Sequence, residues 1–253
     1  MLKLLIDYAN QHQIILELNE KNKDGNYPLL SLLCPLLCPL LRDILNNNDE
    51  IIKLLIEYAN QHQIIFELNE KDEDGNYPFL EAISWNNIEM VKLLIEYANQ
   101  HQIILELYEE NKYGEYPLLE AISKNNIEMV KLLIDYANRH QIILELNEKR
   151  KYGYYPLLRA IDIEIVKLLI EYANQHQIIL ELNDKNKDGN YPLLWAISKN
   201  NIEIVQLLIE YALQHQITLE LNKKTEYGYY PLYQAIDENN KYEKKTSAFR
   251  SYF

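Results

Sequence analysis

Residues 75–113 read GNYPFLEAISWNNIEMVKLLIEYANQHQIILELYEENKY, and versions of this stretch return along the whole chain. Every glycine of the sequence stands two residues ahead of a Tyr-Pro pair. These glycines are Gly25, Gly75, Gly114, Gly153, Gly189 and Gly228, and their successive separations are 50, 39, 39, 36 and 39 residues. A period in this range is typical of arrays in which small units stack on their neighbours.

One unit predicts two helices. Gly75 can make a turn with positive φ, and Pro78 suits the first position of a helix, where an N–H is not needed. This first helix should end at the polar residues from Ser84 onward. Asn86, with Glu89 three residues later, then resembles a capping box that opens the second helix. The same features predict first helices at Pro117, Pro156, Pro192 and Pro231, and caps at Asn125 and Asn200.

The second helix carries more apolar surface than a surface helix needs. In residues 88–98 one face holds Ile88, Val91, Leu94, Ile95 and Ala98, and Met90, Leu93 and Tyr97 widen it. Such a helix must be covered on two sides, which requires stacked neighbours. We therefore predict an all-α helix-turn-helix repeat solenoid.

The unit resembles the ankyrin repeat, whose pattern contains G-x-T-P-L-H-x-A-A followed by E-I-V-K-L-L-L-E. The matching positions are Pro78, Phe79, Ala82, Ile83, Glu89, Met90, Val91, Lys92, Leu93, Leu94, Ile95, Glu96 and Ala98. The resemblance covers nearly the whole chain. It implies an ankyrin-like solenoid with short turns or minimal β-hairpins between repeats, and a concave side of loop tips and first helices that binds partner proteins.

This sequence departs from the family pattern in three ways. Tyr77 replaces the threonine whose hydroxyl would cap the first helix, and Leu80 replaces the histidine of T-P-L-H. The unit has 39 residues where the family has 33, and the extra residues lie in the ANQHQIILELNE segment. We interpret them as a longer second helix and connection.

The array is one domain, 1–253, with irregular copies. We divide it into 1–24 (second helix only), 25–74 (with an 11-residue insertion), 75–113, 114–152, 153–188 (shortened), 189–227 and 228–253 (a partial or capping repeat). In the shortened copy Asp162 is the expected cap of the second helix. We expect the N-terminal helix to leave Leu2, Leu4, Leu5 and Ile6 uncovered by the array. This favours a fragment of a longer array or a partner that covers these residues, and otherwise a monomer unless the helix self-associates.

Chemistry-bearing residues are few and belong to the repeat. Cys34 and Cys38 could form a metal or redox pair, but Pro35 and Pro39 would break the helix that aligns them. The six histidines recur once per unit, too far apart to share a metal, and are interpreted as structural. Because no catalytic or nucleotide-binding motif occurs, we expect no enzyme, no cofactor and no bound metal.

The net charge of the chain and the length of its apolar segment limit the kinds of partner that we expect. The net charge of -13 and pI near 5.0 argue against nucleic acid and anionic membranes, and favour a neutral or basic protein partner. Residues 29–41 are too short to span a membrane and contain two prolines. With no signal-type segment and two cysteines, a soluble protein of the cytoplasm is expected.

Recognition should depend on the positions that differ between copies, namely the loop tips and the third residue after the motif proline. The candidate partner-binding residues are Glu81, Trp85, Tyr113, Glu120, Tyr152, Tyr154, Arg159, Trp195, Tyr227 and Tyr229. We hypothesise a non-enzymatic protein–protein interaction scaffold on whose curved recognition surface they lie. Two alternatives stay open: neutral drift at these positions, and a structural spacer or fragment of a longer ankyrin-repeat protein.

Overall fold

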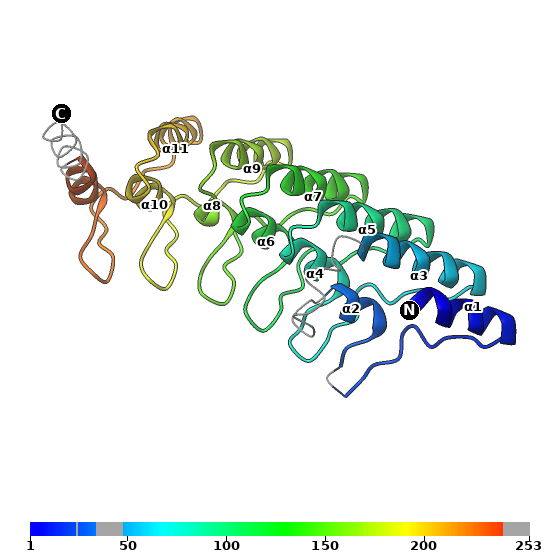
Figure 1. Ribbon diagram of the computed structural model, residues 1–253. Helices are drawn as coiled ribbons and strands as arrows, with labels where there is room; N and C mark the ends of the chain where they lie inside the picture. Colours follow the sequence, from blue (N-terminus) through cyan, green and yellow to red (C-terminus); the bar gives the residue numbers. More distant parts are fainter. Residues whose placement is uncertain (24, 34–47, 240–253) are drawn as a thin grey trace, which may run out of the picture. The chain divides into compact units, whose positions relative to one another are not determined.

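The computed structural model describes residues 1–23, 25–33 and 48–239 (Figure 1), and these residues form helices, turns and extended connections without a strand. Long helices alternate with short ones along the chain. The long helices are α1 (Leu2–His12), α3 (Asn48–His62), α5 (Ile88–Gln100), α7 (Ile127–Arg139), α9 (Ile163–Gln175) and α11 (Ile202–Gln214). The short helices are α2 (Pro28–Leu33), α4 (Pro78–Ser84), α6 (Pro117–Ser123), α8 (Pro156–Arg159) and α10 (Pro192–Ser198). Residues 231–239 are also helical, whereas Cys34 and Cys38 lie outside the described residues.

The short helices begin at the motif prolines, as predicted. Before α4, Tyr77 is extended, with φ −141° and ψ 160°, and its side chain makes no capping hydrogen bond. Pro78 then occupies the first turn, where its missing N–H leaves no bond unmade. In the shortened copy α8 has only four residues, because Ala160 already returns to an extended conformation.

The long helices are capped one residue later than the sequence predicts. The Oδ1 atom of Asn87 accepts a hydrogen bond from the backbone N–H of Met90 at 3.1 Å, so Asn87 is the cap of α5. Asn86 instead adopts a left-handed conformation, with φ 56°, and ends the preceding turn. Asparagine suits both places, which is why the sequence pattern could not separate them. The predicted cap Asp162 is confirmed at α9, where its side chain accepts from the N–H of Glu164.

Each long helix ends in a tight left-handed turn built on glutamine. After α5, Gln102 has φ 56°, and the N–H of Ile103 donates to the carbonyl of Ala98 at 2.8 Å. Glycine normally holds this place because it has no Cβ to crowd the carbonyl. The residues that lengthen the unit therefore lie largely after the helix, in an extended connection that runs from Ile103 toward the next turn.

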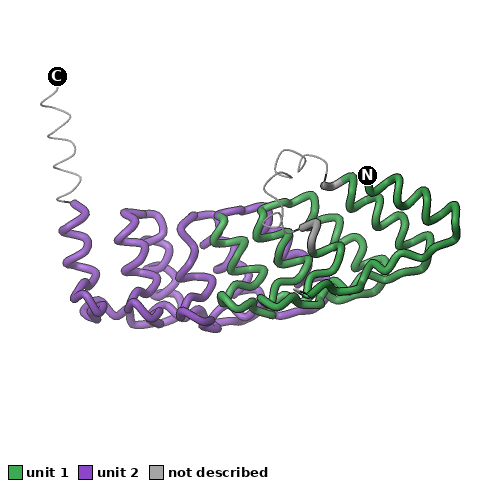
Figure 2. The backbone as a smooth tube through the Cα atoms, turned by 60° about the horizontal axis from the view of Figure 1, so that its bottom comes forward, with its two compact units in different colours: residues 1–124 green, residues 125–253 purple. Residues whose placement is uncertain are grey.

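The chain divides into two compact units, residues 1–124 and 125–253 (Figure 2). In unit 1 the short helices α2, α4 and α6 pack in one layer, and the long helices α1, α3 and α5 pack in a second. In unit 2 α8 packs beside α10, while α7, α9 and α11 form the long-helix layer. Apolar side chains between the layers, such as Leu80 and Leu94, are fully buried. This packing confirms the predicted helical solenoid.

Buried tyrosines replace the hydrogen-bonding groups that the sequence lacks. The hydroxyl of Tyr77 reaches the carbonyls of Glu106 and Glu109, at 3.0 and 3.2 Å, in the connection that follows α5. The hydroxyl of Tyr97, on α5, donates to the carbonyl of Ile64 and accepts from the N–H of Phe66 in the preceding connection. The connections thus keep their polar backbone groups satisfied although they are extended and partly buried.

The repeated histidines also serve packing. His101 lies against the ring of Tyr97, with 4.2 Å between ring centroids, and its Nε2 is 2.9 Å from the Oδ1 of Asn60 on the preceding long helix. The same arrangement joins His62 to Asn10 and His176 to Asn138. Each of these imidazoles is therefore engaged with neighbouring side chains.

Candidate functional site

Long loops project from the helix layers between one long helix and the next short helix (Figure 1). We call these loops fingers, and take them as residues 69–76 and 108–115 in unit 1 and 147–154, 183–190 and 222–229 in unit 2. Each finger is a tight turn. In the first of them the Oδ1 atom of Asp72 accepts from the N–H groups of Asp74 and Asn76, and the N–H of Gly75 donates to the Asp72 carbonyl. The tip therefore has a fixed backbone.

Neighbouring fingers within a unit touch through their backbones. A Cβ atom added at Gly189 would lie 2.9 Å from the Cα of Thr225 in the next finger, and Gly189 also has φ +81°. The N–H of Lys187 donates to the carbonyl of Tyr152, in the finger before, at 3.2 Å. Glycine is required here for two reasons, the backbone conformation and the close approach. The fingers of unit 2 form a contiguous row.

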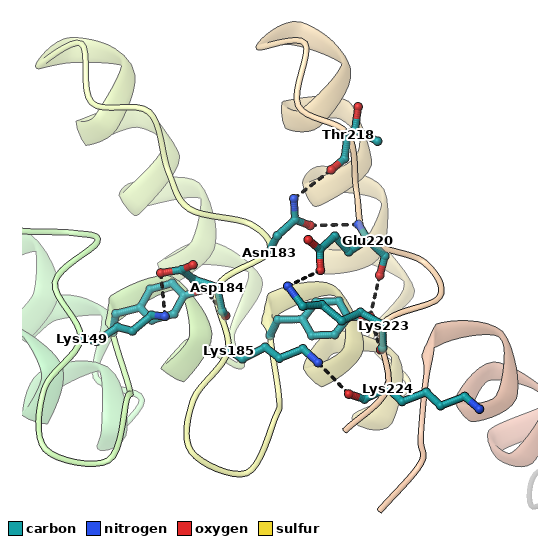
Figure 3. Close-up of polar contacts among 10 residues, drawn as sticks. Lys149, Asn183, Asp184, Lys185, Thr218, Glu220, Lys223 and Lys224 are labelled. Atoms are coloured by element: carbon teal, nitrogen blue, oxygen red, sulfur yellow. Dashed lines mark hydrogen bonds and ion pairs between the residues drawn. The ribbon is translucent and has the colours of Figure 1, made fainter. Parts of the chain in front are cut away.

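Side chains join the connections at the base of the fingers (Figure 3). Asn183 donates from Nδ2 to the carbonyl of Thr218 and accepts at Oδ1 from the N–H of Glu220. Lys149 pairs with Asp184 at 2.8 Å, and Lys185 donates to the carbonyl of Lys224 at 2.6 Å. The corresponding asparagine of unit 1, Asn69, makes the same two contacts with Ile104 and Glu106. These bonds fix the spacing of the finger row.

The predicted aromatic residues lie at the finger tips and the turn after α4, and most are exposed. Tyr152 and Tyr227 keep 51% and 78% of their surface accessible. Tyr113, Tyr229 and Trp85 are also exposed, and Tyr154 is partly buried. The structure therefore presents phenol rings in the finger row of unit 2 and one at the end of unit 1. Exposed aromatic rings are suitable anchors for a partner.

The two candidate carboxylates, Glu81 and Glu120, are not accessible at the surface. Both side chains are buried, at 8% and 7% exposure, because the short helices pack close beside each other. The carboxylate of Glu81 accepts a hydrogen bond from the Nε1 of Trp85 at 3.0 Å, and that of Glu120 pairs with Lys124 at 3.1 Å. Each carboxylate thus forms its hydrogen bond or ion pair with the residue one helical turn later.

Unit 1 surrounds Glu81 with negative charge. Burial raises the pKa of Glu81 from 4.5 to about 7, the hydrogen bond from Trp85 opposes this rise, and Asp72, Glu115 and Glu120 add to it. Loss of water around a carboxylate disfavours its charged form, and like charges do the same. The pKa of Glu81 therefore lies near neutrality.

Unit 2 uses the equivalent places for cations and aromatic rings. The guanidinium of Arg159 lies 5.2 Å from the ring centroid of Tyr154, and the ammonium of Lys199 lies 4.4 Å from that of Trp195. Arg159 and Trp195 are both partly buried. A cation over an aromatic face is attracted by the ring's quadrupole. Helices α4 and α6 of unit 1 therefore carry carboxylates at the third position after the motif proline, whereas α8 and α10 of unit 2 carry a cation or an aromatic ring.

The seventh position after the motif proline also differs between copies, and its contact with the third position was not predicted from the sequence. Trp85, Lys124 and Lys199 occupy it, and each contacts the third-position residue one turn earlier: Glu81, Glu120 and Trp195, respectively. Of these, only Trp85 was among the candidate residues predicted from the sequence. Residues four apart on a helix lie on one face, so the pairing could have been found from spacing alone.

Neither a metal-binding cluster of three side chains nor a membrane-spanning helix occurs in the part of the chain that the structure describes. In residues 1–23, 25–33 and 48–239 no three His, Cys, Asp or Glu side chains come together to hold a metal ion. Within the same ranges no helix has the length and apolar character needed to cross a membrane. The finger rows present aromatic faces, charged groups and backbone hydrogen-bonding groups, all of which are suited to contacting another molecule.

Comparisons with known proteins show which family has this arrangement. A family model for ankyrin repeats (3 copies) matches residues 97–179 and 174–244, and one for ankyrin repeats (many copies) matches residues 44–95. No curated protein matches the chain.

Several solved structures share the fold. An ankyrin repeat domain from Acinetobacter baumannii AYE has a TM-score of 0.59 at 20% identity, covering 83% of this chain and 94% of its own. The ankyrin repeat domain of Bcl-3, a member of the IkappaB protein family, has a TM-score of 0.58 at 18% identity, covering 92% and 86%. The ankyrin repeat protein EF0377 has a TM-score of 0.56 at 22% identity, covering 82% and 96%. With family matches that extend over more than half of its length, the chain belongs to the ankyrin-repeat family.

Proposed function

We propose that this protein is a non-enzymatic scaffold of the cytoplasm that binds a partner protein through its fingers and short helices. One observation carries the proposal: most tyrosines that occur at the finger tips of only some copies are exposed, whereas the tyrosine that precedes the motif proline in every copy is buried in all but the last. Tyr152 and Tyr227 are exposed, while Tyr77 and its equivalents Tyr27, Tyr116, Tyr155 and Tyr191 are buried. Ankyrin repeats generally act as protein–protein interaction modules, which agrees with this division of roles.

The test is affinity capture from source-cell lysate followed by a direct binding measurement with the identified protein. The variant carries Tyr152→Ser and Tyr227→Ser, which remove two exposed rings of the finger row in unit 2. Ile179→Ser is the matched control, because Ile179 is as exposed as Tyr152, at 51%, but lies in the connection after α9. We expect a partner that both the unaltered chain and the control bind and that the tyrosine variant loses.

The alternative is a structural spacer without a partner of its own. It predicts that no captured protein depends on the finger tips, so the tyrosine variant and the Ile179→Ser control would give the same captured set. Circular dichroism on all three proteins establishes beforehand that they are equally helical.

A further inference from the structure

The charge of the fingers reverses between the two units. Fingers 69–76 and 108–115 of unit 1 carry two cations against seven carboxylates, whereas the three fingers of unit 2 carry seven cations against four carboxylates. The net charge of -13 hides this division. At physiological ionic strength charges are screened beyond about 8 Å, so a partner at the fingers of unit 2 responds to the local charge.

Several carboxylates at the base of the unit 2 fingers are already neutralised within the molecule. Asp184 pairs with Lys149, Glu148 pairs with Arg150, and Glu220 pairs with Lys223. By contrast, Lys187 and Lys199 form no ion pair with any described residue, and each lies over an aromatic ring. Their charge is therefore available to an incoming anion.

Lys187 belongs to a local cluster that spans two fingers. Its ammonium and that of Lys151 each lie 5.7 Å from the ring centroid of Tyr152, so one exposed ring sits between cations of neighbouring fingers. The bond from the Lys187 N–H to the Tyr152 carbonyl holds the two fingers together. A carboxylate can meet the ammonium groups while an apolar side chain covers the ring.

Resting on the proposed function, we propose that the finger row of unit 2 binds an acidic, extended peptide segment of the partner. Lys151, Tyr152 and Lys187 are its central contacts. Stacked helices repeat at about 8 to 10 Å, and an extended segment in the polyproline II conformation advances about 3.1 Å per residue with three residues per turn, so that every third side chain lies on one face. Acidic residues at every third position of the segment would thus meet successive fingers.

The test uses fluorescence anisotropy with labelled twelve-residue peptides of four Glu-Gly-Ser triplets, beside Gln-Gly-Ser and Lys-Gly-Ser versions. We expect the glutamate peptide to bind at least ten times more tightly than the other two, and its binding to weaken as salt is raised. A peptide with the same composition but its four glutamates consecutive should bind more weakly than the spaced version. Equal binding of the glutamate and glutamine peptides overturns the proposal.

Charge reversal locates the site. Lys151→Glu with Lys187→Glu should weaken binding of the glutamate peptide at least tenfold. The matched control is Lys131→Glu with Lys167→Glu, which makes the same change of charge on exposed residues of α7 and α9 in the same unit. Equal losses in the two double variants would show a general charge effect and overturn the assignment.

Two further probes test whether the site prefers another kind of polyanion to an acidic peptide. A comparison of partner capture with peptide binding tests this inference independently of the proposed function. Tighter binding of oligo-uridine RNA, or of vesicles rich in phosphatidylserine, than of the glutamate peptide overturns the assignment of a peptide ligand. If the captured partner depends on Tyr152 and Tyr227 but the peptide does not bind, the acidic segment is wrong while the scaffold function stands.

Discussion

The indole Nε1 of Trp85 lies 3.0 Å from the carboxylate of Glu81, one turn earlier along α4 and its C-terminal turn. In the next short helix Lys124 takes the place of Trp85 and pairs with Glu120. In unit 2 Trp195 and Lys199 hold the same two places as an aromatic–cation pair. Three different pairings therefore use one spacing, and each differs from the next at only one of the two positions.

The buried carboxylate of Glu81 makes stability depend on pH. Its pKa is about 7 in the folded protein against 4.5 when unperturbed, so the folded state holds the proton more tightly. The resulting stabilisation is fully present below pH 4.5 and is lost as pH rises through 7. We expect Glu81→Gln to remove about 1 to 3 kcal/mol of the fall in unfolding free energy between pH 5 and pH 8.

Urea unfolding followed by circular dichroism at several pH values measures this difference. Glu89→Gln is the control, since Glu89 is an exposed carboxylate on α5. Its pH profile should match that of the unaltered protein. A Glu81→Gln profile that also matches would show that the carboxylate is already solvated.

Tyrosine hydroxyls fasten the connections, and removing one should be costly. Tyr77→Phe keeps the buried ring but leaves the carbonyls of Glu106 and Glu109 without their donor. We expect a loss of about 1 to 3 kcal/mol in unfolding free energy. Tyr113→Phe, at an exposed tip, should change it by less than about 0.5 kcal/mol. Equal effects in urea unfolding would contradict the proposed role of the buried hydroxyl.

The cap of α11 can be assigned by comparing its two adjacent asparagines. Asn201 accepts from the N–H of Ile204, while Asn200 has φ 52°. Asn201→Ala should cost about 1 kcal/mol, because an N–H of the first turn loses its acceptor. Asn200→Gly should change stability by less than about 0.5 kcal/mol, because glycine accepts the left-handed conformation. Thermal unfolding with the reverse ranking would place the cap at Asn200.

Because the fingers approach each other closely, alanine substitution should lower the unfolding free energy by different amounts at two glycines with the same backbone conformation. Gly189 and Gly228 have φ +81° and +83°, but only at Gly189 would a Cβ meet a neighbouring backbone, at 2.9 Å from the Cα of Thr225. Gly228→Ala should cost about 1 kcal/mol through its conformation alone. Gly189→Ala should cost at least about 1 kcal/mol more, because the fingers must move apart. Matching unfolding midpoints for the two variants would count against finger packing.

Sequence periodicity predicted the fold, but side-chain placement required the structure. Gly75 and Pro78 are strong local signals, and they placed α4 correctly. Asn86 and Asn87 are the same residue type and differ in which of them adopts the left-handed backbone, a distinction that the pattern does not contain. The burial of Glu81 depends on the closeness of neighbouring short helices, and the contacts of Tyr77 depend on the path of a connection about 30 residues away.

The doubly held connections have a consequence for how such an array can grow. Between α9 and the finger at 183–190, the chain is held by Tyr155 of its own copy, at the carbonyls of Glu181 and Asp184. It is also held by Tyr211 of the following copy, at Ile178 and Leu180. Each copy therefore supplies one tyrosine that holds its own connection and another that holds the connection of the preceding copy. An in-frame duplication of one copy brings both tyrosines with it, so the gene can lengthen without compensating mutations elsewhere.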